Sequence, residues 1–336
     1  MHEVRGKLTR TTTKTTEKDA RHRVAAVAGE TVTPRGRDTK NWPPETRVEG
    51  QRKAVVMSNL DELARKINRE TSVRKTVKRY IGAEFCPIPV PHRTKVPKLK
   101  DWPNLRISRK DVGEYFDDID QNIGVLLGEP SNDLVDIDLD CDEAIRLAPK
   151  FLPKTGAVFG RKSRPRSHRL YVAPGAKTKK FSCADAMLVE LRSTGAQTLF
   201  PPSVHPEGEK IRWYRLDSFE EVDADDLVAS CENLAAACLL VRRWPAKGSR
   251  QDIALALAGA MLRAELAAEF AERFIELVAK AAGDDEVDKR VSTVPPQANA
   301  RCRPATAPRN RTHGLGHDMG RAHYQADYGG SVWQCS

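Results

Sequence analysis

The sequence lacks the cysteine patterns of disulfide-rich scaffolds and of zinc knuckles. Its seven cysteines are odd in number and scattered, and none are spaced as CxxC: Cys86, Cys141, Cys183, Cys231, Cys238, Cys302 and Cys335. Regularly spaced pairs mark secreted disulfide frameworks, and CxxC pairs mark structural zinc sites. The cysteines therefore predict ordinary thiols in a reducing cytoplasm.

The sequence also lacks long apolar segments. No apolar signal-peptide region stands at the N-terminus, and the longest apolar run, Ile253 to Leu262, is too short to cross a bilayer. We expect a cytoplasmic protein with no membrane partner. A GxxxxGK[ST] phosphate loop is missing as well, so no ATPase motor is expected.

The sequence has fewer acidic residues than basic ones. The chain has 56 Lys and Arg against 46 Asp and Glu, which gives a formal net charge of +10. A basic balance of this kind suits a polyanionic partner such as nucleic acid. The length of 336 residues is sufficient for two domains with tails.

Changes in composition divide the chain into five segments. Residues 1–56 are rich in Arg, Lys, Thr and Pro without apolar periodicity, which predicts a disordered basic tail. Residues 57–78 are predicted as an N-terminal helix, capped by Asn59 or by Ser58. Residues 79–222 are the main domain, and 223–292 a linker and a helical module with two helices between Arg250 and Gly283. Residues 293–336 lose all periodicity and are predicted to be disordered.

Strand-like runs dominate between Asn122 and Tyr214, and one helical piece, DEAIRLAPKFL, interrupts them. The runs are NIGVLLG, LVDIDLD, GAVFG, HRLYV, MLVELR, TLFPPSV and IRWYR. Because strands outnumber helices, the fold class is predicted to be α+β and not a doubly wound sheet.

The run LVDIDLD has three aspartates at alternate positions, and it indicates function more strongly than the other runs. A β-strand places Asp136, Asp138 and Asp140 on one face and the intervening Ile137 and Leu139 on the other. Such a face repels itself without a cation, and carboxylates are the ligands that Mg²⁺ and Mn²⁺ prefer. An edge strand with a solvated acidic face is the alternative that this run alone leaves open.

Two later residues favour the metal site. His168 follows a basic loop that suits phosphate oxygens, although an ordinary histidine at a strand end is the alternative. Glu190 lies between Val189 and Leu191, where a carboxylate is costly to bury unless it is paired or bound to metal. Pairing with Arg192 on a solvated face is the alternative for Glu190.

The order of a DxD pair, a histidine motif, an acidic residue and PPS resembles a known family. It is similar to the bifunctional primase-polymerase domain of the archaeo-eukaryotic primase superfamily, found in replication proteins of phages, prophages and plasmids. The resemblance runs from near Tyr80 to Trp213 and includes the loop that holds Lys95. It implies an RRM-like core with an added N-terminal α/β unit.

The resemblance assigns roles residue by residue. Asp138 and Asp140 match the metal-binding pair, Glu190 matches the third metal-binding acid, and His168 matches the histidine that contacts the nucleotide's phosphates. Asp136, two residues earlier on the strand, is an additional metal candidate. The residues assigned to nucleotide or phosphate contacts are Lys95, Arg164, Arg166, Arg192 and Ser203. For Lys95, Arg164 and Arg166, a solvated basic loop is the alternative.

The implied activity is that of a DNA primase or polymerase, a nucleotidyltransferase that uses two Mg²⁺ or Mn²⁺ ions. The implied partners are a DNA template and primer, nucleoside triphosphates and a separate replicative helicase. We also expect the neighbouring Arg164, Arg166 and Arg169 to lower the pKa of His168 in the free protein.

Two other hypotheses remain from the sequence. The absent motor and the loss of periodicity after Val294 are typical of a truncated or frame-shifted gene. The chain would then be a catalytically impaired prophage remnant that binds nucleic acid or nucleotide without synthesis. A plain RRM-like RNA-binding module is less favoured, because HRLYV and IRWYR lack the stacking aromatics of that class.

Overall fold

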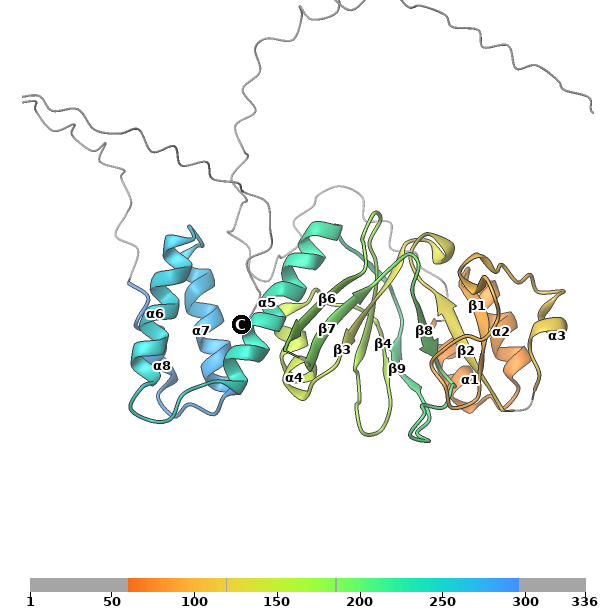
Figure 1. The fold of residues 1–336 in the computed structure, drawn as a ribbon, viewed down its shortest axis with the longest axis horizontal. Coiled ribbons are helices and arrows are strands. Elements are labelled where there is room, and N and C mark those ends of the chain that lie inside the picture. Colours follow the sequence, from red (N-terminus) through yellow and green to blue (C-terminus); the bar gives the residue numbers. More distant parts are fainter. Residues whose placement is uncertain (1–59, 119, 185, 296–336) are drawn as a thin grey trace, which may run out of the picture. The chain divides into compact units, whose positions relative to one another are not determined.

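The computed structural model describes residues 60–118, 120–184 and 186–295 (Figure 1). The expected basic tail of residues 1–56, the capping residues Ser58 and Asn59, and residues 296–336 lie outside the described residues. The fold is mixed α+β, with two mainly antiparallel sheets followed by helices. No helix within the described ranges is long and apolar enough to cross a membrane.

The helices have at most ten residues in the N-terminal half, and the longest ones, α5 to α7, lie in the C-terminal half. They are α1 (Leu60–Arg69), α2 (Val73–Gly82), α3 (Val112–Tyr115), α4 (Asp142–Phe151), α5 (Ala224–Arg242), α6 (Arg250–Arg263), α7 (Ala268–Ala281) and α8 (Val287–Val291).

The strands form a small sheet and a large sheet. The small sheet has the order β1-β2-β8 and the large one the order β6-β7-β3-β5-β4-β9, with β10 paired to β5. The strands are β1 (Cys86–Pro91), β2 (Gln121–Leu126), β3 (Leu134–Leu139), β4 (Ala157–Gly160), β5 (His168–Val172), β6 (Lys179–Cys183), β7 (Ala186–Arg192), β8 (Gln197–Phe200), β9 (Arg212–Leu216) and β10 (Glu220–Glu221). Each of the seven strand-like runs of the sequence overlaps one of these strands, and DEAIRLAPKFL contains α4.

The N-terminal segment differs from the single helix that the sequence predicts over 57–78. The chain leaves the helix after Arg69 and starts a second one at Val73. Ser72 has an extended backbone, and its hydroxyl accepts a hydrogen bond from the backbone N of Lys75 at 3.2 Å. A serine in this position begins a helix, so the capping preference of Ser72 interrupts the helical pattern.

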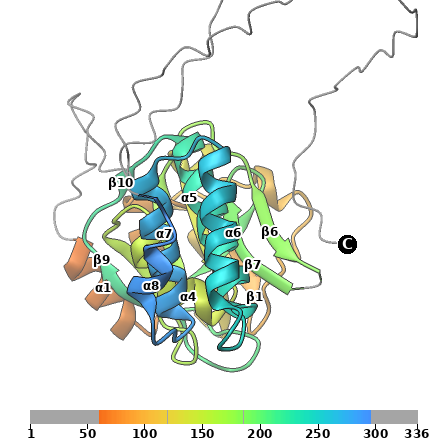
Figure 2. The ribbon, with the colours of Figure 1, turned by 90° about the vertical axis from the view of Figure 1, so that its left-hand side faces the viewer.

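The large sheet is covered on both faces. Val135, Ile137 and Leu139 of β3 pack with α4, α5 and α7 in one core, and α5 to α8 gather on this side (Figures 1 and 2). The other face packs against the small sheet with α1 and α2, in a second core rich in aromatic rings. The aromatic residues of that core are Tyr80, Phe85, Phe116, Phe159, Phe200, Trp213 and Phe219.

The prediction of a linker directly after residue 222 was wrong over α5. Asp223 caps this helix by accepting from the backbone N of Asp225 and of Asp226. Its buried residues lie along one face of the helix: Leu227, Ser230, Cys231, Leu234, Ala235, Ala237 and Cys238. The other side also carries apolar residues, among them Val228, Ala236 and Leu240, which are partly buried. The contrast between an apolar and a polar face, which is the signal that the sequence prediction required, is therefore weak. The two helices expected between Arg250 and Gly283 are confirmed as α6 and α7.

Replacement of Tyr80 tests how the two sheets are held together. Its buried hydroxyl donates to the carbonyl O of Pro201 at 2.5 Å and accepts from Nε1 of Trp213 at 3.1 Å. Tyr80→Phe leaves both partners buried without a hydrogen bond, which we expect to lower the free energy of unfolding by about 1–3 kcal/mol. Denaturant unfolding measures the change, with Tyr115→Phe at an exposed tyrosine as the control. Equal stability of the two variants would contradict this role of Tyr80.

Candidate metal and nucleotide site

The site is built on three neighbouring strands of the large sheet. β3 lies between β5 and β7, and the register sets Asp138 opposite both His168 and Glu190. Asp136 lies opposite Arg192. Directly opposed residues of antiparallel strands place their side chains on the same face and close together. The fold therefore gathers residues that are more than fifty positions apart in the sequence.

Three carboxylates meet at the end of β3. Asp138, Asp140 and Glu190 each offer an oxygen within 4.8 Å of the others, and within the described ranges no other triple of His, Cys, Asp or Glu gathers in this way. The backbone N of Asp140 donates to the carbonyl O of Leu188 at 3.0 Å, and its own carbonyl O accepts from Arg164 Nη1 at 2.6 Å. These contacts fix Asp140 beyond the strand end. An all-oxygen set of three carboxylates fits a hard divalent cation.

Arg192 balances part of the negative charge. Its Nη2 lies 2.7 Å from Asp138 Oδ2 and 2.7 Å from Glu190 Oε2, and its Nε donates to Glu190 Oε2 at 2.8 Å. Burial alone would lower the pKa of Arg192, but the surrounding carboxylates, Asp138 first, outweigh it and raise this pKa. A buried carboxylate pair without this cation would be costly in free energy.

The acidic residues differ in how readily they ionise. Burial raises the pKa of Asp138, but the charges of His168 and Arg192 outweigh burial, and the net pKa is lowered. Burial and the neighbouring charge of Asp138 raise the pKa of Asp140 to about 6. Asp140 therefore holds a proton more readily than Asp138 does in the absence of a cation.

Asp136 lies outside the group of three and contacts His168 instead. It is fully buried, and its Oδ2 and Oδ1 lie 2.9 Å and 3.2 Å from His168 Nδ1. The imidazole stacks on Phe159 with 4.4 Å between ring centroids, and its Nε2 lies 3.6 Å from Asp138 Oδ1. Asp136 and Phe159 thus orient the ring so that Nε2 faces the carboxylate group.

The expected lowering of the His168 pKa was wrong. Burial does lower this pKa, but the charges of Asp138 and Asp136 outweigh burial, and the net pKa is raised. The arginines that the sequence places nearby act elsewhere. Arg164 binds the Asp140 carbonyl, and Arg166 lies over the ring of Tyr214. Arg169 is next along β5, and its side chain points to the opposite face of the sheet.

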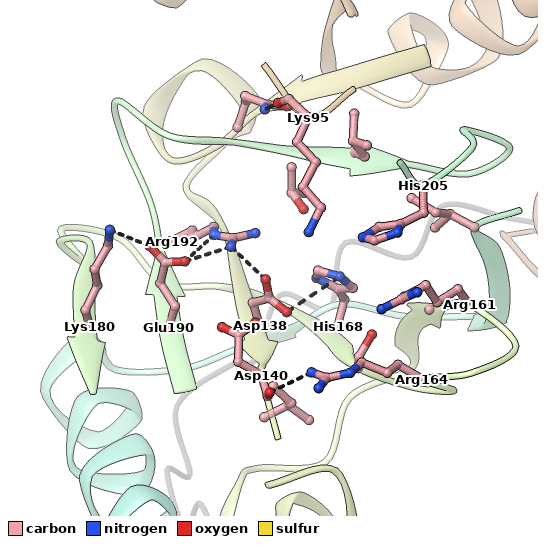
Figure 3. Close-up of a pocket in the computed structure, with 17 residues that line it drawn as sticks. Lys95, Asp138, Asp140, Arg161, Arg164, His168, Lys180, Glu190, Arg192 and His205 are labelled. Carbon is pink, nitrogen blue, oxygen red and sulfur yellow. Dashed lines mark hydrogen bonds and ion pairs between the residues drawn. The ribbon is translucent and has the colours of Figure 1, made fainter. Parts of the chain in front are cut away.

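The carboxylates line a pocket of about 380 Å³ that several basic side chains also line (Figure 3). Lys95, His205, Arg161 and Arg164 face the acidic group from above and from one side in this view, and Lys180 and Arg192 from the other. A pocket with acidic residues at one end and cations around it matches the charge pattern of a metal-bound triphosphate.

Residues 77–226 match the family model described as bifunctional DNA primase/polymerase, N-terminal (Prim-Pol). The members of this family are nucleotidyltransferases. The match covers a little under half of the chain and contains every residue of the pocket. It implies DNA primase or polymerase activity, with DNA and nucleotides as substrates. No curated protein matches the chain.

Most of the residues assigned from sequence lie in the pocket, within the segment that matches the Prim-Pol model. Lys95, Arg164, His168 and Arg192 line it together with the three carboxylates. Arg166 and Ser203 are not among the lining residues. The Ser203 hydroxyl is buried, where it accepts from the backbone N of Ile123 and donates to its carbonyl O. A nucleotide contact by Arg166 or Ser203 stays a prediction.

The sequence analysis missed six polar residues of the pocket, which are Arg161, Ser167, Lys180, Gln197, Thr198 and His205. Arg161 directly follows β4 and is held by Glu207 and Glu209. Lys180 lies on β6 opposite Glu190, with its Nζ 3.6 Å from Glu190 Oε1. His205 lies two residues after Ser203 of the PPS motif, so its position in the sequence could have indicated that it belongs to the site. The place of Lys180 depends on the pairing of β6 with β7, which the sequence does not reveal.

The raised pKa of Asp140 predicts how a cation binds to the site. Metal binding requires the ionised carboxylate and displaces its proton, so the affinity falls as the pH falls through about 6. With one proton displaced, we expect the Mn²⁺ dissociation constant to rise about tenfold per pH unit below that point. Titration calorimetry one unit above and one unit below pH 6 measures this. Asp140→Asn should bind more weakly without this dependence, and a wild-type affinity that is flat with pH would contradict the assignment.

Proposed function

We propose that the chain catalyses template-directed nucleotidyl transfer as a DNA primase/polymerase. One observation carries the proposal: Asp138, Asp140 and Glu190 converge from two strands at one end of a pocket that seven basic side chains also line. Enzymes that transfer nucleotidyl groups combine acidic metal ligands with cations for the phosphates. The Prim-Pol match over residues 77–226 supports the same reaction.

The acidic group would hold two Mg²⁺ or Mn²⁺ ions, with Asp138, Asp140 and Glu190 as ligands. Bound ions of this kind lower the pKa of an attacking 3′-hydroxyl and neutralise the triphosphate. Asp136 is better suited to orienting His168 than to binding metal, because both its oxygens face His168 Nδ1. We therefore assign Asp136 to the orientation of His168, in place of the metal-ligand role that the sequence offered for it.

The basic side chains would bind the nucleotide. His168 Nε2 is directed into the pocket by Asp136 and Phe159, so it can donate to a phosphate oxygen when the ring is charged. Its raised pKa favours that charge. Lys95, Arg161 and Arg164 lie around the same space and would hold further phosphate oxygens.

The finer parts of the proposal rest on the resemblance. We propose an RRM-like core with an N-terminal α/β unit for the Prim-Pol segment, and replication of a phage, prophage or plasmid as its setting. A separate replicative helicase is the partner that this setting implies. Residues 223–292 would form an appended module whose first helix is α5.

Removal of a metal ligand tests the reaction directly. Asp138→Ala and Asp140→Ala should each lower nucleotide incorporation at least a hundredfold, because loss of a ligand removes the metal and leaves the core in place. Primer extension and de novo synthesis with labelled nucleotides and Mn²⁺ measure the effect. Asp142→Ala is the matched control, since Asp142 is exposed, lies two residues from Asp140 and does not line the pocket.

The ligand assignment is wrong if both variants keep wild-type incorporation. Circular dichroism must first show that the variants are folded. Asp140 is only half-buried, which makes its variant the less disturbing of the two.

Replacement of His168 separates nucleotide binding from DNA binding. His168→Ala should raise the apparent KM for nucleotide about tenfold or more, because a charge-assisted bond to phosphate is lost. The affinity for primer-template should change much less, since other basic residues contact the backbone. Separate titrations with nucleotide and with labelled DNA give the two affinities.

A structural histidine would behave differently. Its loss would lower the melting temperature and weaken both affinities to the same degree, and that pattern would count against the nucleotide contact. Asp136→Asn supplies a graded comparison, because an amide oxygen can still accept from Nδ1 of His168.

A further inference from the structure

The edge strand β9 carries a bulge that turns an aromatic side chain outward. Phe159 of β4 pairs with Trp213 of β9, but the preceding Val158 pairs with Arg215, so Tyr214 is the extra residue. Trp213 and Leu216 are buried, whereas Tyr214 and Arg215 are both exposed. A bulge re-aims side chains in this way and is common next to functional sites.

The backbone around the bulge is firmly held. The side chain of Asn68 in α1 donates to the carbonyl O of Trp213 at 2.9 Å and accepts from its backbone N at 3.0 Å. The indole of Trp213 donates to the hydroxyl of Tyr80. The hydroxyl of Tyr214 donates to the carbonyl O of Arg161 at 3.4 Å. Tyr214 is therefore a fixed aromatic platform that is still 43% exposed.

Two exposed arginines flank the platform. The guanidinium carbon of Arg166 lies 5.7 Å from the centroid of the Tyr214 ring, and Arg212 lies two residues before Tyr214 on β9. Within the described ranges neither Arg166 nor Arg212 forms an ion pair with a carboxylate, whereas Arg215 pairs with Asp217 at 3.4 Å. The surface of Tyr214, Arg166 and Arg212, here called the Tyr214 platform, keeps its positive charge free for a partner.

The Tyr214 platform is connected to the rim of the pocket. The loop between β4 and β5 supplies Arg161 and Arg164 to the pocket and Arg166 to the platform. The backbone of this loop is closely packed, because a Cβ on Gly160 would lie 2.5 Å from the carbonyl O of Arg164 and 2.8 Å from the N of Arg166. A strand that leaves the pocket along this loop therefore meets Tyr214.

We propose that the Tyr214 platform binds the single-stranded template, with a base stacked on the Tyr214 ring and phosphates held by Arg166 and Arg212. This inference rests on the proposed function and adds to it the surface that the template contacts. An exposed aromatic ring beside free cations is the combination by which proteins bind single-stranded nucleic acid without reading its sequence. A duplex fits less well, because its base faces are already covered by neighbouring bases.

The test measures binding of a short dye-labelled oligothymidine to the full chain by fluorescence anisotropy, without nucleotide or metal. Tyr214→Ala should weaken binding at least fivefold, and Tyr214→Phe should restore it, because stacking requires the ring and not the hydroxyl. Tyr115→Ala is the matched control at another exposed tyrosine and should have no effect. Competition with unlabelled duplex should be weaker than with unlabelled single strand.

The arginines are tested through salt. Arg166→Ala and Arg212→Ala should each reduce the slope of log Kd against log salt by about 0.7, as expected for one phosphate contact on a single strand. Arg263→Ala, at an exposed arginine on α6, should leave the slope unchanged.

The Tyr214 platform is ruled out if folded Tyr214→Ala binds the oligothymidine as wild type does, or if the full chain prefers duplex. Absence of any binding by the wild-type chain would also overturn it. The readout does not require synthesis, so it is independent of the proposed activity. Tyr214-dependent binding by a chain that incorporates no nucleotide would keep the platform and reject the polymerase function.

Discussion

The structure depends on one electrostatic constraint, the burial of several carboxylates side by side on a central strand. Asp136 and Asp138 of β3 and Glu190 of β7 are all buried on one face of the large sheet. Arg192 and His168 compensate part of this charge from the strands on either side. Asp140, at the strand end, keeps a raised pKa because burial and the charge of Asp138 outweigh the opposing charges of Arg192 and His168. Burial of these carboxylates costs free energy, and a bound cation and triphosphate would complete the balance of charge at this site.

Side chains along β3 alternate between the two faces of the sheet, so this strand belongs both to the site and to the core. Asp136 and Asp138 face the pocket side, while Val135, Ile137 and Leu139 anchor the strand against α4 and α5. The small sheet packs on the pocket side with an aromatic core that includes Phe159, and Phe159 also stacks on His168. The packing that stabilises the fold thus also fixes the ring that faces the carboxylates, and the bulge at Tyr214 extends the same scaffold to the surface.

The sequence predicted the parts of the site whose signal is local. The alternation in LVDIDLD places the aspartates on one face, and the order of motifs brings in His168 and Glu190. It offered the pairing of Glu190 with Arg192 as an alternative. It did not predict the contacts of Asp136 with His168, Arg192 with Asp138, and Lys180 with Glu190, because these depend on strand register, which is a long-range property. For the same reason the sign of the His168 pKa shift was wrong, since neighbours in sequence were counted and neighbours in space decide it. Helix α5 was missed because apolar residues such as Val228 and Leu240 also lie outside its buried face and weaken the period that marks a helix.

The central claim is that the grouped carboxylates and the basic pocket make this chain a template-directed nucleotidyltransferase. Incubation of the full chain with a single-stranded template, a primer, Mn²⁺ and labelled nucleotides tests it most directly, with a parallel reaction without primer for de novo synthesis. We predict products whose composition follows the template and that disappear when the template is omitted. Folded protein that binds nucleotide and DNA but yields no product under any of these conditions would contradict the claim and favour a binding module without synthesis.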